Sequence, residues 1–146
     1  PSLKGRALRA LAAREYSCAE LRRKLEPHVQ AEDKLDDLLQ ELQAKGFVSD
    51  ARAAQSLVHR RGQKLGAARV LQELRQKGVA PEAVLDAAQQ LKTTELERAR
   101  AVWQKKFGDA ALGDASERAR QMRFLASRGF APDVIRKVLR HDEDVL

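Results

Sequence analysis

The chain of 146 residues repeats one short segment three times, and this repetition limits its possible folds more than any other feature. Ala31–Leu35 returns 49 residues later as Ala80–Val84 and, after a further 51, as Ala131–Ile135. Because self-similarity at such a spacing is typical of tandem structural units, the sequence predicts three consecutive units. We place them at residues 1–48, 49–93 and 94–146.

Apolar spacing and capping residues predict three short helices in each unit. In the first unit, Ser17 and Glu20 have the spacing of a capping box that starts a helix, and Gly46 suits the left-handed position that ends one. In the second unit we expect helices over 50–63, 67–77 and 81–92. No segment alternates polar and β-branched residues as a strand would, so the expected fold class is all-α.

The third unit follows the same logic. A cap-like pair, Thr94 with Glu97, predicts that a helix begins near residue 94, and Asp114 with Glu117 is a second such pair. Pro132 suits the first turn of the last helix. Because units this small bury too little surface to be stable alone, we expect three tandem three-helix repeats in an elongated, slightly curved array.

The chain is strongly basic, and the basic residues are concentrated. The net charge is +7, with a pI near 9.9, which favours a polyanion or an acidic protein surface as the partner. Residues 51–80 carry seven basic side chains and one acidic side chain. Arginine suits bidentate contact with carboxylates and phosphates alike, so both partners stay open. The predicted partner-binding residues are Arg22, Arg23, Lys24, Arg52, Arg60, Arg61, Lys64, Arg69, Arg75 and Lys77.

Catalytic and metal-binding patterns are almost absent from the sequence. None of His28, His59 and His141 has a second histidine at the spacing of a helical metal site. Cys18 falls in the first turn of a predicted helix, where the dipole lowers a thiol pKa, but without a nearby histidine we interpret it as a packed small residue. We therefore expect a protein that is not an enzyme and that uses no metal or cofactor.

Aromatic residues are few, and their spacing favours core packing over stacking on nucleic-acid bases. Those at core-like helical positions in the third unit are Trp103, Phe107, Phe124 and Phe130. Phe47 follows a helix-ending glycine and is expected to pack as a hydrophobic staple.

The expected location is the cytoplasm. The longest apolar runs span only a few residues, so the sequence predicts neither a membrane-spanning helix nor a signal peptide. The single cysteine rules out an intramolecular disulfide and fits a reducing compartment.

Several motifs, taken in order, resemble those of the RecX family, bacterial regulators of RecA. The first are Arg14-Glu15-Tyr16-Ser17 and Lys45-Gly46-Phe47-Val48-Ser49-Asp50. Later matches are Arg60-Arg61 ahead of Gly66, Lys77-Gly78, and Arg128-Gly129-Phe130. The resemblance runs from about Leu3 to Leu139. Two positions depart from the family pattern, namely Ala67 after Gly66 and Ala53 after Arg52.

The resemblance implies a specific activity. RecX proteins consist of three three-helix repeats, bind RecA filaments on single-stranded DNA, and inhibit filament growth, ATP hydrolysis, strand exchange and coprotease function without catalysis of their own. Beside the RecA filament, we expect weak affinity for single- or double-stranded DNA, none for membranes, and a monomer. The main alternative is a nonspecific DNA-binding module of helix-turn-helix type. Because the chain has no asparagine, the side chain best suited to adenine, sequence-specific recognition is disfavoured.

Overall fold

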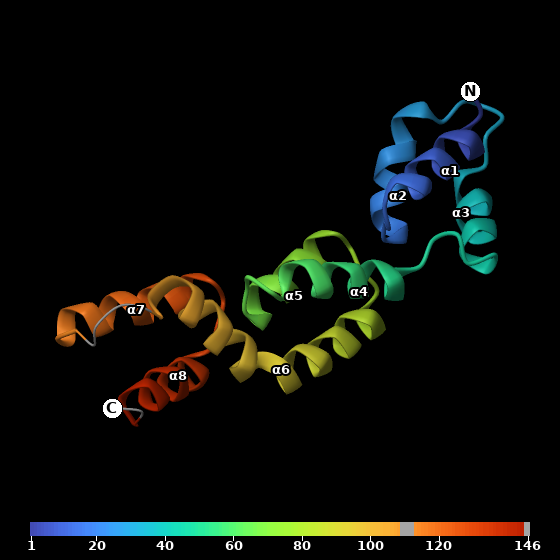
Figure 1. Cartoon of the computed structure of the whole chain (residues 1–146). Coiled ribbons are helices and arrows are strands. Elements are labelled where there is room, and N and C mark those ends of the chain that lie inside the picture. The colour runs from blue at the N-terminus through green and yellow to red at the C-terminus, as the bar shows by residue number, and fades with distance from the viewer. Residues whose placement is uncertain (109–112, 145–146) are drawn as a thin grey trace. The chain divides into compact units, whose positions relative to one another are not determined.

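The computed structural model describes residues 1–108 and 113–144, without the side chains of 141–144, and every regular element within them is helical (Figure 1). The expected all-α class is confirmed. The α-helices, with one 3₁₀ turn, are α1 (Leu3–Ala13), α2 (Cys18–Leu25), η1 (Glu26–His28), α3 (Leu35–Ala44), α4 (Asp50–Arg61), α5 (Ala67–Gln76), α6 (Pro81–Phe107), α7 (Ala115–Ser127) and α8 (Pro132–Asp144).

Local signals place most helix ends correctly. The capping box is present, because the Ser17 side chain accepts from the Glu20 amide while the Glu20 side chain accepts from the Ser17 amide. Asp114 accepts from the amide of Glu117 in the same manner at the start of α7. Gly46 and Gly129 follow helices with φ of 77° and 95°, values that glycine adopts without the clash of a Cβ atom.

One predicted helix start is wrong. Residues 81–107 form one continuous helix, so the helix expected over 81–92 does not end there and none begins near 94. The Thr94 hydroxyl lies 3.4 Å from the Gln90 carbonyl oxygen and accepts from Arg98 Nε at 2.8 Å, so it bonds within its own helix instead of capping a new one. No glycine or proline follows Pro81 in this helix. The expected boundary after residue 93 therefore falls inside α6.

The chain divides into two compact units. The N-terminal unit comprises residues 1–56 and 74–85, and the C-terminal unit comprises residues 57–73 and 86–146. Helices α4, α5 and α6 each contribute residues to both units.

The core of the N-terminal unit is built from α1, α2 and α3. Leu21, Leu25 and Leu42 have at most 1% of their surface exposed, and Ala7 packs among them. The apolar faces of three short amphipathic helices thus meet in one cluster.

Polar contacts join distant segments within this N-terminal unit. The Asp50 carboxylate accepts from the backbone amides of Cys18 at 2.8 Å and Ala80 at 2.7 Å. The Ser17 hydroxyl donates to the Lys77 carbonyl. Lys77 Nζ in turn lies 3.2 Å from the Glu20 carboxylate. Two other segments of chain, the start of α4 and the turn between α5 and α6, are therefore fixed to the start of α2.

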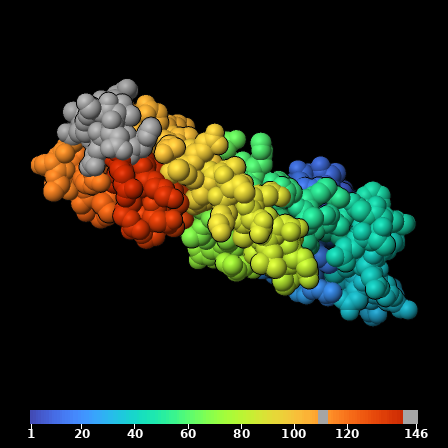
Figure 2. Space-filling view, turned by 90° about the horizontal axis from the view of Figure 1, so that it is seen from below, coloured from blue at the N-terminus to red at the C-terminus, as the bar shows by residue number. Residues whose placement is uncertain are grey.

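The C-terminal unit has its own core, in which α8 packs on α6 and α7 (Figure 2, red against yellow and orange). Leu125, Ile135 and Leu139 are buried around Ala99. The Gly66 amide donates to the carbonyl of Arg128 at 2.7 Å. A Cβ on Gly66 would lie 2.3 Å from the Gly129 carbonyl, so this close approach requires glycine.

A buried ion pair organises the same unit. Arg98 and Glu95 pair on α6, with 16% and 10% of their side chains exposed. The Glu95 carboxylate accepts from the Ala67 amide at 2.9 Å, and Arg98 donates to the carbonyl oxygens of Gly62 and Leu65. The pair therefore holds the segment between α4 and α5 against α6.

Candidate functional site

Four of the ten predicted partner-binding residues form ion pairs inside their own unit. Arg22 pairs with Asp36 and Arg52 with Glu15. The other two pairs are Arg61 with Glu73 and Lys77 with Glu20. Because each of these cations is offset by a neighbouring carboxylate, its charge is less available to an external anion.

Four more of the ten lie outside ion pairs with described residues. Arg23 donates to the Gln76 carbonyl at 3.2 Å and Arg69 to the Ser127 carbonyl at 2.7 Å, so each keeps its full charge but is held in place. Arg60 and Arg75 are exposed and have no polar partner among residues 1–108 and 113–140. These two remain free to contact a partner.

The remaining two, Lys24 and Lys64, line cavities. Lys64 belongs to a cavity of about 460 Å³ in the C-terminal unit, which we call the C-terminal basic cavity. Its volume is in the range of ligand-binding pockets. No carboxylate is among its lining residues, which are Gln63, Lys64, Ala101, Val102, Lys105, Lys106, Phe124 and Arg128.

An aromatic ring is surrounded by cations in this cavity. Lys106 Nζ lies 5.1 Å from the centroid of the Phe124 ring, and the guanidinium carbon of Arg128 lies 4.8 Å from it. The edge of Phe107 meets the same ring at 5.4 Å between centroids. Cation–π attraction orients both basic side chains, so positive charge is fixed around a half-buried aromatic surface.

The packing predicted for the aromatic residues is confirmed in the third unit and wrong for Phe47. Phe107 and Phe130 are each 3% exposed, and Trp103 packs on the same core while donating to Gln121 Oε1 at 2.8 Å. Phe47 is 50% exposed. The turn at Gly46 ends α3 through backbone hydrogen bonds and leaves the Phe47 ring outside the core.

Cys18 is a packed residue, as expected, and its thiol pKa is raised instead of lowered. Burial raises the pKa of Cys18, and the negative charge of Asp50 raises it further. The thiol packs against the N-terminal core. The acidic cap that fixes the start of α2 thus opposes formation of a reactive thiolate.

Sequence reasoning missed several residues of the cavities. Lys105, Lys106 and Arg128 join Lys64, although they are far from it in the chain. The adjacent lysines at the end of α6 were the available signal, but only the fold brings them to Lys64. A second cavity, in the N-terminal unit, brings Arg6, Arg9 and His28 to Lys24.

The described part of the chain has features that bear on metal binding and on membrane spanning. Within it, no three His, Cys, Asp or Glu side chains gather as metal ligands would, and the side chain of His141 lies outside the described residues. None of the helices described here combines the length and the apolar character that crossing a membrane requires.

Comparison with known proteins identifies the family. Residues 49–87 match the second three-helix domain of RecX, and residues 93–139 match its third. The chain is similar to the regulatory protein RecX of Leptothrix cholodnii, with 53% identity over 98% of this chain and 94% of the relative. It is 41% identical to that of Ralstonia nicotianae, over 99% of this chain and 91% of the relative.

Solved structures share the fold. The crystal structure of RecX from Lactobacillus salivarius matches with a TM-score of 0.80 and 18% identity, covering 99% of this chain and 96% of that one. A second crystal structure of a regulatory protein RecX matches with a TM-score of 0.78 and 22% identity, over 94% of this chain and 71% of that one. With the motifs and the all-helical fold, these matches show that the chain belongs to the RecX family of regulatory proteins.

Proposed function

We propose that this protein binds RecA filaments assembled on single-stranded DNA and restrains them, inhibiting filament growth, ATP hydrolysis, strand exchange and coprotease activity. It acts in the cytoplasm, as a monomer and without catalysis of its own. Family membership supports RecA as the partner. The three repeats at 1–48, 49–93 and 94–146 would each offer a separate contact, and several weak contacts on one filament add avidity.

The C-terminal basic cavity is the observation that carries the proposal for this chain. Its four basic side chains have no carboxylate among their lining neighbours. An unbalanced positive site of this kind attracts an acidic protein surface or a phosphate backbone. The half-buried Phe124 adds an apolar surface, as in protein interfaces where a buried aromatic residue sits among arginines.

The test is RecA's ATP hydrolysis on single-stranded DNA with this protein added below the ratio that would coat the strand. Strong inhibition at such ratios is expected. Lys64→Gln with Lys105→Gln should weaken it, because both lysines are exposed and line the cavity. Lys92→Gln with Arg100→Gln removes the same charge from exposed positions outside it, and serves as the matched control.

Arg60→Ala with Arg61→Ala tests whether the central repeat, at residues 49–93, also contacts RecA. Since Arg61 also pairs with Glu73, the unfolding midpoint of this double variant must be measured together with its inhibition of RecA. No inhibition of RecA by the unaltered protein at any ratio would refute the proposal. Equal loss in the cavity variant and its control would mean that net charge matters and the cavity does not.

A second candidate is a nonspecific DNA-binding module, which the same unbalanced charge favours. Inhibition that begins only when the strand is saturated would support it. Binding to bare DNA should fall steeply with salt, because each phosphate contact releases a counterion. Binding to RecA through a mixed apolar and polar contact should lose less affinity as the salt concentration rises.

A further inference from the structure

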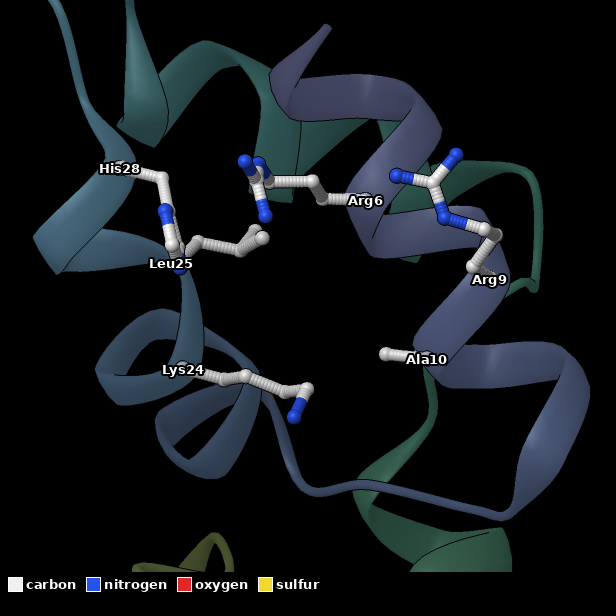
Figure 3. Close-up of a pocket in the computed structure, with 6 residues that line it drawn as sticks. All are labelled: Arg6, Arg9, Ala10, Lys24, Leu25 and His28. Atoms are coloured by element: carbon white, nitrogen blue, oxygen red, sulfur yellow. The ribbon is translucent and has the colours of Figure 1, made fainter. Parts of the chain in front are cut away.

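The N-terminal unit contains a second cavity, of about 350 Å³, between α1, α2 and η1. We call it the N-terminal basic cavity. Its lining residues are Arg6, Arg9, Ala10, Lys24, Leu25 and His28. Figure 3 shows that Arg6 reaches from α1 toward α2 and η1, while Lys24 reaches from α2 in the opposite direction. Side chains from two helices therefore border one space.

The charge of this cavity is not balanced by the protein. Arg6, Arg9 and Lys24 are its three permanent cations, and no aspartate or glutamate lines it. None of their three side chains makes a hydrogen bond or ion pair with another residue in the described ranges. By contrast, Arg22 and Arg52 in the same unit are paired with carboxylates. The cations around the cavity thus keep their donors available to a ligand.

Repulsion among the like charges that line this cavity is reduced when an anion binds among them. Guanidinium groups bind phosphate oxygens through two parallel hydrogen bonds, and a lysine adds a mobile point charge. The volume is at the lower end of the range for ligand pockets. We propose that the N-terminal basic cavity is a binding site for a phosphate group, carried either by a polynucleotide backbone or by a terminal or free nucleotide.

Phosphate fits the lining better than an acidic peptide does. A phosphate offers several oxygens to donors arriving from different directions, whereas a carboxylate offers two oxygens in one plane. The apolar part of the lining is limited to Ala10 and Leu25, and Leu25 is only 1% exposed. A peptide would find little apolar surface there to anchor its side chains.

The first test uses inorganic phosphate as the probe and backbone amide NMR shifts of the full chain as the readout. Saturable shifts are expected at residues 6–10 and 24–28. Chloride at matched ionic strength should not produce them. Arg9→Gln with Lys24→Gln should abolish them, and both side chains are exposed, so the fold should persist. Lys34→Gln with Lys92→Gln removes equal charge from exposed positions outside the cavity and should leave the shifts intact.

The second test identifies the source of the phosphate with oligothymidylates of one length. If the backbone binds, a 5′-hydroxyl strand shifts the same amides as a 5′-phosphorylated one. The Arg9 and Lys24 variant then lowers the slope of log K against log salt by about 0.7 per lost contact. If a terminal phosphate binds, only the phosphorylated strand and thymidine 5′-monophosphate shift these amides.

Two results would overturn the proposal. One is that chloride and phosphate shift the same amides equally, which would mean screening alone. The other is that a polyglutamate peptide shifts them while phosphate and both strands do not, which would indicate a carboxylate site. Because no RecA is present in either test, failure here would leave the proposed regulation of RecA untouched, and failure of that regulation would not affect this site.

Discussion

Replacing Arg98 with alanine should destabilise the C-terminal unit more than any other single loss of charge we consider. The guanidinium donates to the carbonyls of Gly62, Leu65 and Leu91 at 2.9, 2.8 and 3.0 Å, and it pairs with Glu95. The substitution would remove the donor of these carbonyls and would leave the Glu95 carboxylate, which is only 10% exposed, with the Ala67 amide but without its cation.

The magnitude follows from the burial of the pair. Removing one partner of a buried ion pair costs about 3–5 kcal/mol, because the other charge stays desolvated. A loss of that size is a large part of the roughly 5–15 kcal/mol by which a domain is stable. At about 2–4 °C per kcal/mol for chains of this length, the melting temperature should fall by roughly 10 °C.

Thermal unfolding followed by circular dichroism at 222 nm is the assay. Arg98→Lys keeps the charge but loses the planar fork, so its midpoint should lie between those of the alanine variant and the unaltered protein. Arg100→Ala is the control, since Arg100 is exposed and has no partner in the described chain, and its cost should stay within about 0.5 kcal/mol. Equal midpoints for Arg98→Ala and Arg100→Ala would refute the reasoning.

Three further outcomes are expected. Gly66→Ala should cost about 2–3 kcal/mol in thermal unfolding, because its Cβ would lie 2.3 Å from the Gly129 carbonyl; an unchanged midpoint would contradict this. Burial raises the pKa of Glu20, but the Ser17 amide and Lys77 lower it to a net value below its ordinary range. The stability that Glu20 contributes is therefore present at neutral pH and lost as the pH falls through that lowered pKa. Glu20→Gln should accordingly cost about 1 kcal/mol at pH 7 and almost nothing at pH 2 in urea unfolding, and an equal cost at both would count against it. Cys18 should react with a disulfide reagent more slowly than free cysteine at pH 7.5, because its thiol pKa is raised; a faster rate would show the opposite.

Helix ends could be predicted because their signals are local. A capping box or a helix-ending glycine acts within four residues, so Ser17 and Gly129 can be interpreted without knowing the fold. The same local rule failed at Thr94, whose spacing to Glu97 imitates a cap. Arg98 favours a continuous helix over a new start at Thr94, because it binds the Thr94 hydroxyl and also holds the loop before α5 to the helix.

Of the candidate site, only the sign of its charge could be predicted from the sequence. Composition indicates that the surface is basic, but not which cations are balanced. Arg52 pairs with Glu15 across 37 positions of sequence and Lys77 with Glu20 across 57. No periodicity connects such residues, because the pairing depends on how the helices pack. The cavities are equally nonlocal, since Lys64 joins Lys105 and Arg128 only in the folded C-terminal unit.

Internal pairing therefore determines how charge substitutions in this protein should be interpreted. A cation such as Arg61, which is bound to Glu73, contributes to the fold, so its loss changes stability and partner binding together. A cation such as Lys105 has no such partner in the described chain, and its loss should change binding while leaving the unfolding midpoint in place. Measuring both quantities for each variant separates the two classes. The opposite pattern would contradict this location of the interface. In that pattern, substituting the unpaired cations of the cavities leaves RecA inhibition unchanged, whereas substituting paired cations reduces inhibition without changing stability.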